Sequence, residues 1–208
     1  MKKGLLITLE GPDGSGKTTQ IQLLEEYLKQ KGFEIIKTRE PGGTPISEKI
    51  RNIILDNRNT EMSDMCEALL YAASRAQLVN EIIKPSIEEG KIVICDRFVL
   101  SSIVYQGIGR ELGIEKIKYI NQAALEGLEP DLTIMLTIPY EEGLKRKYKQ
   151  KTLDRLENSG NKFHEKVFNG YLDISKNYDK IKLVNANKNV KEVHNQIVEI
   201  VDSLIKNK

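Results

Sequence analysis

The chain has few of the residues that build disulfide frameworks and metal clusters. Its 208 residues include only two cysteines, Cys66 and Cys95, and two histidines, His164 and His194. Cys95 stands inside an apolar run, where a thiol packs as a small hydrophobic group, and so low a cysteine content is typical of a reducing compartment. A disulfide is therefore not expected. The two histidines predict neither a paired metal site nor a catalytic triad.

Long apolar runs are also missing. The run at residues 5–9 ends at Glu10, and it is too short for a signal peptide, whose apolar part takes roughly seven to fifteen residues. No other segment approaches the roughly 20 apolar residues of a membrane-spanning helix. The net charge of +2 is too small to indicate a nucleic-acid binder. We expect a cytoplasmic protein with a single domain over residues 1–208 and neither nucleic acid nor membrane as a partner.

Short apolar runs alternate along the chain with segments of helical periodicity. A long helix is expected over residues 63–89, bent or broken near Pro85, and the last helix covers about residues 190–204. Alternating strands and helices predict an α/β fold, in which helices cover both faces of a parallel sheet and ligands bind at the carboxyl edge of its strands. The five expected strands lie at residues 5–9, 33–38, 92–95, 132–138 and 182–186.

A complete phosphate-loop motif, G-x-x-x-x-G-K-[ST], directly follows the first expected strand. Strand, glycine-rich turn and helix are the order that this motif needs, because its backbone N–H groups and the helix N-terminus then surround a phosphate chain. Lys17 would reach the β- and γ-phosphates of a nucleoside triphosphate, and Thr18 would hold Mg²⁺. The residues expected to bind the triphosphate are Gly11, Pro12, Asp13, Gly14, Ser15, Gly16, Lys17 and Thr18.

Arginine is scarce, with eight residues against 24 lysines, so its positions are informative. Arg39 and Arg97 each follow an expected strand, at the edge of the sheet where ligands bind, and a guanidinium can grip a phosphate with two hydrogen bonds. Surface ion pairs are the alternative for each. Asp96 stands where phosphate-loop enzymes keep the acid directed at Mg²⁺, although it could instead cap a helix.

Three further residues indicate a second substrate. Asp13 lies inside the phosphate loop, where a carboxylate would repel a triphosphate, so we expect it to face a sugar hydroxyl of another molecule. Tyr71 and Arg75 are four positions apart on one helix face, so a ring and a guanidinium could hold one planar base. Packing in the core is the alternative for Tyr71.

The basic run KRKYKQK at residues 145–151 permits two interpretations. It is either a solvated helix face or a lid that brings positive charge to a transferring phosphoryl group. No candidate general base accompanies these residues. An acceptor that is itself a phosphate monoester needs none, because its second pKa is near 6 and its oxygen is already a nucleophile at neutral pH.

Residues 9 to about 172, most of the chain, resemble the thymidylate kinases, and five blocks in this stretch stand in the family's order and spacing. The resemblance implies a P-loop kinase fold with three layers and a short lid at about residues 143–157. It also implies a homodimer that transfers a phosphoryl group from ATP to dTMP with Mg²⁺. The blocks are LEGPDGSGKTTQ, TREPGGTPISEKIR, ALLYAASRAQ, CDRFVLSSIVYQG and LDRLE.

The resemblance also implies roles for single residues. Asp13 would bond the deoxyribose 3′-hydroxyl, Tyr71 would stack on thymine and Arg75 would bond that base, while Arg39 and Arg97 would hold the acceptor phosphate and Asp96 would approach the metal. Ser101 and Gln106 would line the thymine edge, Tyr105 would lie near the 2′ carbon, and residues 184–186 would lie beside adenine. Relatives without an arginine in the phosphate loop usually supply one from the lid. We therefore expect Arg155, or else Lys151, to contact the transferred phosphoryl group.

Two other functions stay open at this point. A GTPase-like switch would need a guanine-reading N-K-x-D, but Asn187-Lys188-Asn189-Val190 lacks the aspartate, and no D-x-x-G follows the loop. A kinase for another nucleoside monophosphate would keep the same fold. A hydrophobic slot rejects a missing methyl group by only about 1–3 kcal/mol, so dUMP could be a slow substrate.

Overall fold

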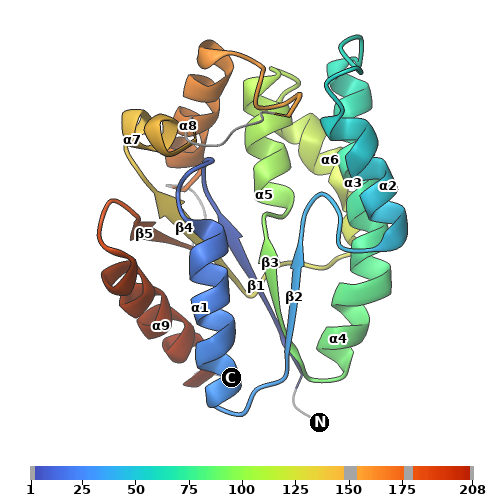
Figure 1. The fold of residues 1–208 in the computed structure, drawn as a ribbon. Coiled ribbons are helices and arrows are strands. Elements are labelled where there is room, and N and C mark those ends of the chain that lie inside the picture. The colour runs from blue at the N-terminus through green and yellow to red at the C-terminus, as the bar shows by residue number, and fades with distance from the viewer. Residues whose placement is uncertain (1–2, 148–153, 176–179, 207–208) are drawn as a thin grey trace.

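A computed structural model describes residues 3–147, 154–175 and 180–206. Five parallel strands form one sheet in the order β2-β3-β1-β4-β5 (Figure 1). The strands are β1 (Leu5–Glu10), β2 (Ile35–Arg39), β3 (Ile92–Asp96), β4 (Leu132–Thr137) and β5 (Ile181–Asn185). Each lies within two residues of its predicted bounds, so the predicted parallel sheet is confirmed.

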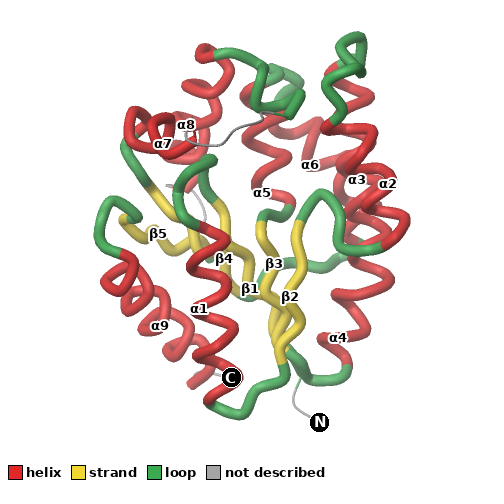
Figure 2. The backbone as a smooth tube through the Cα atoms, viewed as in Figure 1, coloured by secondary structure: helices red, strands yellow, loops and turns green. Residues whose placement is uncertain are grey.

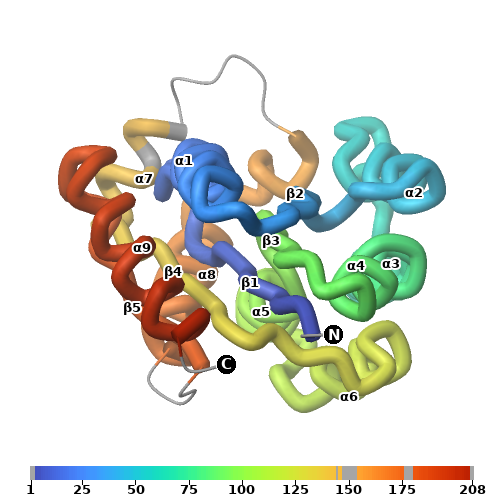
Figure 3. The backbone as a smooth tube through the Cα atoms, turned by 90° about the horizontal axis from the view of Figure 1, so that it is seen from below, coloured from blue at the N-terminus to red at the C-terminus, as the bar shows by residue number. Residues whose placement is uncertain are grey.

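Helices cover both faces of the sheet. They are α1 (Lys17–Gln30), α2 (Pro45–Leu55), α3 (Asp64–Leu78), α4 (Lys84–Glu88), α5 (Val99–Ser102), α6 (Ile114–Leu125), α7 (Tyr140–Lys147), α8 (Asn161–Ser175) and α9 (Val190–Lys206). Figure 3 shows α1 and α9 on one face and α3 to α6 with α8 on the other. Alternate strand residues divide accordingly: Ile7 and Ile94 pack toward α1 and α9, whereas Leu6 and Val93 pack toward the α3–α4 side.

The predicted long helix changes its type just before Pro85. A π-helical turn, Val79–Ile83, joins α3 to α4, and the N–H of Lys84 bonds to the carbonyl of Val79. Proline lacks an N–H and its ring crowds the carbonyl four residues earlier, so a wider turn at this point relieves the clash. The expected irregularity near Pro85 is therefore present as a change of helix type, and α3 and α4 are not separated by a break.

The register of the strands aligns their carboxyl ends. Asp96 pairs with Leu9 of β1 and with Arg39 of β2, so the loops that follow these three strands emerge at one edge of the sheet (Figure 2). In the part of the chain that is described, no helix has the length and apolar character needed to cross a membrane.

Candidate active site

The phosphate loop curls around the side chain of Lys17. Gly11, Gly14 and Gly16 have φ angles of 134°, 77° and 90°, which disfavour side chains, and a Cβ at Gly14 would lie 2.6 Å from the carbonyl oxygen of Gly143. Lys17 Nζ donates to the carbonyl oxygens of Gly11 at 2.9 Å and Pro12 at 3.0 Å. Burial, and after it the charge of Arg97, lowers the pKa of Lys17 to about 8. The ammonium thus lies among carbonyl oxygens that triphosphate oxygens could replace.

Thr18 and Asp96 face each other beside this loop. Thr18 Oγ1, in the first turn of α1, donates to Asp96 Oδ2 at the end of β3 at 3.5 Å. Mg²⁺ prefers oxygen ligands and commonly takes one or two from the protein, with phosphate and water completing its octahedron. A hydroxyl and a carboxylate next to a phosphate loop fit that donor set. Among the described residues there is no cluster of three His, Cys, Asp or Glu side chains that could hold a metal ion.

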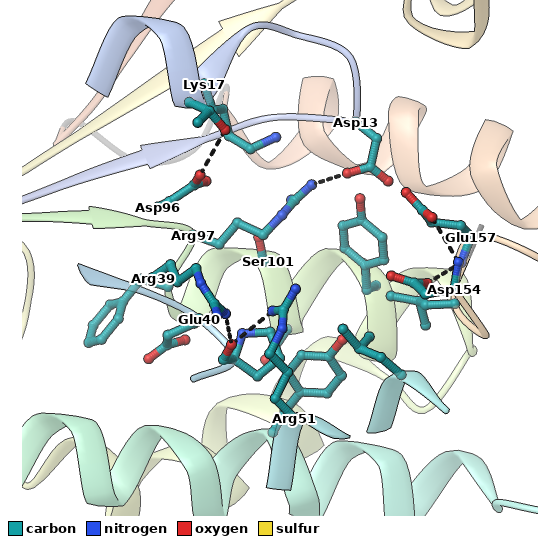
Figure 4. A pocket seen from close by; sticks show the side chains of 18 of the residues that line it. Asp13, Lys17, Arg39, Glu40, Arg51, Asp96, Arg97, Ser101, Asp154 and Glu157 are labelled. Atoms are coloured by element: carbon teal, nitrogen blue, oxygen red, sulfur yellow. Dashed lines mark hydrogen bonds and ion pairs between the residues drawn. The ribbon is translucent and has the colours of Figure 1, made fainter. Parts of the chain in front are cut away.

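Arg97 links the phosphate loop to the opposite side of the site. It directly follows β3 with a φ of 68°, and its N–H bonds to the carbonyl of Leu9. Its guanidinium lies 2.5 Å from Asp13 Oδ1 and donates to the carbonyl of Gly11 at 3.0 Å and to Tyr171 Oη at 3.0 Å. Figure 4 shows Asp13 and Arg97 pointing toward each other inside the cavity. The Asp13 carboxylate of the phosphate loop is therefore paired with the positive charge of Arg97.

Glu10, which the sequence did not single out, holds the segment after Arg97 in place. Its carboxylate is fully buried and accepts hydrogen bonds from the N–H of Phe98 at 2.8 Å and from Ser101 Oγ at 2.6 Å. Burial raises the pKa of Glu10, while the hydrogen bond from Ser101 and the charge of Arg97 oppose that rise. The end of β1 is thereby tied to the start of α5.

Arg75 is fixed in the wall of the cavity. It is 1% exposed, and its Nε and Nη2 lie 2.9 and 2.5 Å from Glu40 Oε2, while its other donors reach Ser102 Oγ and Asn121 Oδ1. The guanidinium also lies over the ring of Phe98, 5.5 Å from its centroid. Burial raises the pKa of Glu40 to about 7 against the pull of the Arg75 charge. Such a network holds a planar group rigidly.

One cavity of about 550 Å³ joins the phosphate loop to Tyr71 and Arg75. Of the predicted site residues outside the loop, it brings together Arg39, Tyr71, Arg75, Asp96, Arg97, Ser101, Tyr105 and Gln106. Burial raises the pKa of the Tyr71 hydroxyl, so the ring keeps a neutral phenol at the cavity wall. The alternatives of isolated surface ion pairs for Arg97 and of core packing for Tyr71 do not describe these positions, since both side chains face the same space.

Arg155 is not among the residues that line this cavity. Its Nε donates to the carbonyl of Ile54 at 2.7 Å, and its Nη2 lies 2.6 Å from Glu67 Oε2. Lys151, the other candidate for the transferred phosphoryl group, lies outside the described residues. Arg146 of α7 does line the cavity, and its Nη1 reaches the carbonyl of Ala186 at 3.5 Å. A role of Arg155 at the phosphoryl group stays a prediction.

Several cavity residues had no clear sequence signal. Arg51 lines the cavity and donates to the carbonyl of Pro41 at 2.9 Å, as Arg39 does (Figure 4). Its position as the last residue of the TREPGGTPISEKIR block is the one sequence feature that connects Arg51 with the site. Asp154 and Glu157 close the far side, each accepting a hydrogen bond from the other's backbone N–H at 2.8 and 2.9 Å. Residues 154–157 thus form a self-capped turn at the cavity rim.

The cavity carries two kinds of lining, phosphate-loop residues at one end and Tyr71 with Arg75 at the other. Its phosphate loop fits a triphosphate donor, and the pocket beyond Arg97 fits a planar group with its own phosphate. These features define a P-loop kinase that phosphorylates a small molecule.

Comparison with known proteins narrows this class. The sequence model of the family described as thymidylate kinase matches residues 9–197. A thymidylate kinase of Finegoldia magna is 51% identical over 197 residues, covering 95% of this chain and 97% of the relative, and one of Thermoanaerobacter sp. is 50% identical over 200 residues, covering 96% and 98%. The crystal structure of thymidylate kinase from Ehrlichia chaffeensis superposes with a TM-score of 0.76 at 32% identity, covering 96% of this chain and 99% of that one. The chain belongs to the thymidylate kinase family and has a P-loop kinase fold.

Proposed function

We propose that the protein transfers the γ-phosphoryl group of ATP to dTMP, giving ADP and dTDP. The observation that carries this proposal is the single cavity that runs from Lys17 to Tyr71 and Arg75 in a chain of this family. A GTPase-like switch has no use for a second pocket with a buried guanidinium at its wall.

The donor side of the site acts by charge and alignment. Lys17, released from the carbonyls of Gly11 and Pro12, would bind the β- and γ-phosphates. Mg²⁺, held through Thr18 and Asp96, would neutralise charge on the phosphate oxygens. Arg97 would then turn its guanidinium from the loop carbonyl toward the acceptor phosphate. No proton needs to be abstracted, because the acceptor phosphate is largely ionised at neutral pH.

The acceptor side reads the nucleotide from three directions. Tyr71 would stack on the base while Arg75, held by Glu40, bonds a carbonyl at its edge. Asp13, in the phosphate loop, would accept a hydrogen bond from the sugar 3′-hydroxyl. Ser101, Tyr105 and Gln106 lie along one helical stretch, α5 and the π-helical segment Ile103–Gly109, and would face the base and the 2′ carbon. Arg39 would contact the acceptor phosphate from the end of β2.

A coupled assay of ADP release tests the proposal. The acceptors are dTMP, dUMP, dCMP, dGMP and AMP at equal concentration, with ATP and Mg²⁺ in excess. We expect dTMP to be best and dUMP slower by about 5- to 150-fold, since one methyl group in an apolar slot gives about 1–3 kcal/mol. If another monophosphate is clearly preferred, the chain is a kinase of that nucleotide and the proposed substrate is wrong.

We also propose that the protein is a cytoplasmic homodimer. Large apolar side chains stay exposed on three helices that pack side by side, with Ile53 of α2, Leu69 of α3 and Tyr119 of α6 at 48%, 51% and 76% exposure. A second copy could cover them. Light scattering after gel filtration should give twice the 23.6 kDa of one chain. A monomer at micromolar concentration would contradict the dimer and leave the kinase activity unaffected.

A further inference from the structure

Glu67 is a fully buried carboxylate just behind the base end of the cavity. It lies in the first turn of α3 and is not itself a lining residue. Its two oxygens accept hydrogen bonds from three side chains that come from distant parts of the chain. These are Gln106 Nε2 at 2.9 Å, Arg110 Nη2 at 3.1 Å and Arg155 Nη2 at 2.6 Å. A carboxylate held in this way has one fixed position.

The Gln106 amide stands between Glu67 and the cavity. Its side chain is 1% exposed and lines the cavity, and its Oε1 has no hydrogen-bond partner among the described residues. Buried polar atoms rarely stay unsatisfied, so this oxygen calls for a donor that the protein itself does not supply. The Nε2 group, in contrast, is already used by Glu67.

Chemistry decides which end of the amide faces Glu67. An ionised carboxylate can only accept hydrogen bonds, so the amide must present its NH₂ group to Glu67 and its oxygen to the other side. Burial alone would raise the pKa of Glu67, but the hydrogen bonds from Arg110 and Gln106 outweigh it and keep that pKa below its usual value. Glu67 is therefore an anion at neutral pH, and the amide cannot flip without an acceptor facing an acceptor.

An outward amide oxygen distinguishes pyrimidine bases. Thymine and uracil carry an N–H at ring position 3, which donates, whereas the same ring nitrogen in cytosine is an acceptor. A site that offers an acceptor at this position forms a hydrogen bond with thymine or uracil. With cytosine, two buried acceptors would face each other without a hydrogen bond. Such an unpaired polar group gives stronger discrimination between substrates than a missing methyl group does.

We propose that Glu67 is a positioning residue for base selection: it fixes the Gln106 amide with its oxygen toward the acceptor base, so that the site favours a base with a ring N–H donor. Arg110 and Arg155 both bond this carboxylate, so Glu67 keeps a cationic partner when one of them is changed. The proposal rests on the proposed dTMP kinase function and adds a residue that need not touch the substrate.

The test compares kcat/KM for dTMP and dCMP in a set of variants. Glu67→Gln replaces the acceptor-only carboxylate with an amide of the same shape, so the Gln106 amide can adopt both orientations. Gln106→Met removes the amide at similar volume, and the double variant completes a cycle. Glu111→Gln is the matched control, because Glu111 is an exposed carboxylate paired with Lys166 next to the same segment.

Glu67→Gln should lower the ratio of dTMP to dCMP turnover by about tenfold or more, the effect of about one hydrogen bond, while the KM for ATP changes by less than about threefold. The same substitution in the Gln106→Met background should leave the ratio unchanged. Glu111→Gln should match the unmodified protein. A Glu67→Gln variant that keeps the ratio, or that lowers it equally without Gln106, would overturn the proposal.

Arg110→Lys covers the case in which Glu67→Gln shows no cooperative thermal transition. It keeps Glu67 and its bond to Gln106 while changing the surrounding network, so it should keep the ratio within about threefold if the amide orientation alone sets selection. A tenfold loss there would show that general packing sets the ratio and would overturn the proposal. If the unmodified protein does not phosphorylate dTMP at all, the proposed function itself fails, which is a different result.

Discussion

Removal of the Glu10 carboxylate should destabilise the protein and misplace Arg97. Glu10 is the last residue of β1 and has no exposed surface. Glu10→Ala deletes the acceptor of the Phe98 N–H, leaves a cavity and takes a negative charge away from the partly buried guanidinium of Arg97. Ser101 is less affected, because its hydroxyl also bonds Tyr171 and its N–H also bonds the carbonyl of Phe98.

The expected cost follows from these contacts. An orphaned buried N–H costs about 1–3 kcal/mol, and breaking a buried charged network costs about 3–5 kcal/mol in all. Glu10→Ala should therefore lower the free energy of unfolding by about 3–5 kcal/mol, out of the roughly 5–15 kcal/mol typical of a domain. Glu10→Gln keeps an oxygen for Phe98 but loses the charge and the second acceptor oxygen, which faces Ser101, so it should cost about 1–2 kcal/mol.

Urea unfolding at 25 °C and pH 7, followed by circular dichroism, measures both variants. Glu115→Ala is the control, since Glu115 is 85% exposed and its pair with Lys118 should contribute less than about 0.5 kcal/mol. If Glu10→Ala and Glu10→Gln both stay within about 0.5 kcal/mol of the unmodified protein, Glu10 does not hold this edge of the site.

Three further predictions concern the reactants. Because the pKa of Lys17 is lowered to about 8, its side chain is protonated below pH 8 and loses its proton above it. ATP affinity should therefore be constant below pH 8 and fall above it. Calorimetry at pH 9 in two buffers should show proton uptake when ATP binds, and the Lys17→Ala variant should lack this uptake. Asp13→Asn should raise the KM for dTMP about tenfold, the loss of a charged hydrogen bond, and the KM for ATP much less; initial rates that change both equally would argue against a sugar contact. Thr18→Ala should raise the Mg²⁺ concentration that gives the half-maximal rate by about tenfold. ATP binding without metal, measured by titration of EDTA-treated protein, should not change. If the Mg²⁺ dependence of the rate is unchanged, Thr18 is not part of the metal site.

The sheet and the phosphate loop could be predicted because their signals are local. Each strand is a short apolar run, and the loop motif lies within eight consecutive residues. The segment Ile103–Gly109 carried no such signal. Six of its seven residues are buried, so it lacks the polar face that gives a helix its 3.6-residue pattern.

The contacts that shape the site could not be predicted, because they join residues far apart in the chain. Arg75 bonds Glu40 over 35 positions, Ser101 bonds Glu10 over 91, and Arg155 bonds Glu67 over 88. The sequence placed Arg75 beside a base and Arg155 beside a phosphate from motif position alone. Only the fold shows that a buried carboxylate holds each guanidinium, and that Arg155 turns away from the cavity.

The central claim is that one cavity holds both nucleotides at once, with Lys17 at the donor and Arg75 at the acceptor. The most direct measurement is the binding of a single compound in which adenosine and thymidine are joined through their 5′ positions by a chain of phosphates. We predict that it binds more tightly than ATP or dTMP alone and competes with both in steady-state kinetics. A compound that displaces ATP but leaves dTMP binding unchanged would contradict a shared cavity.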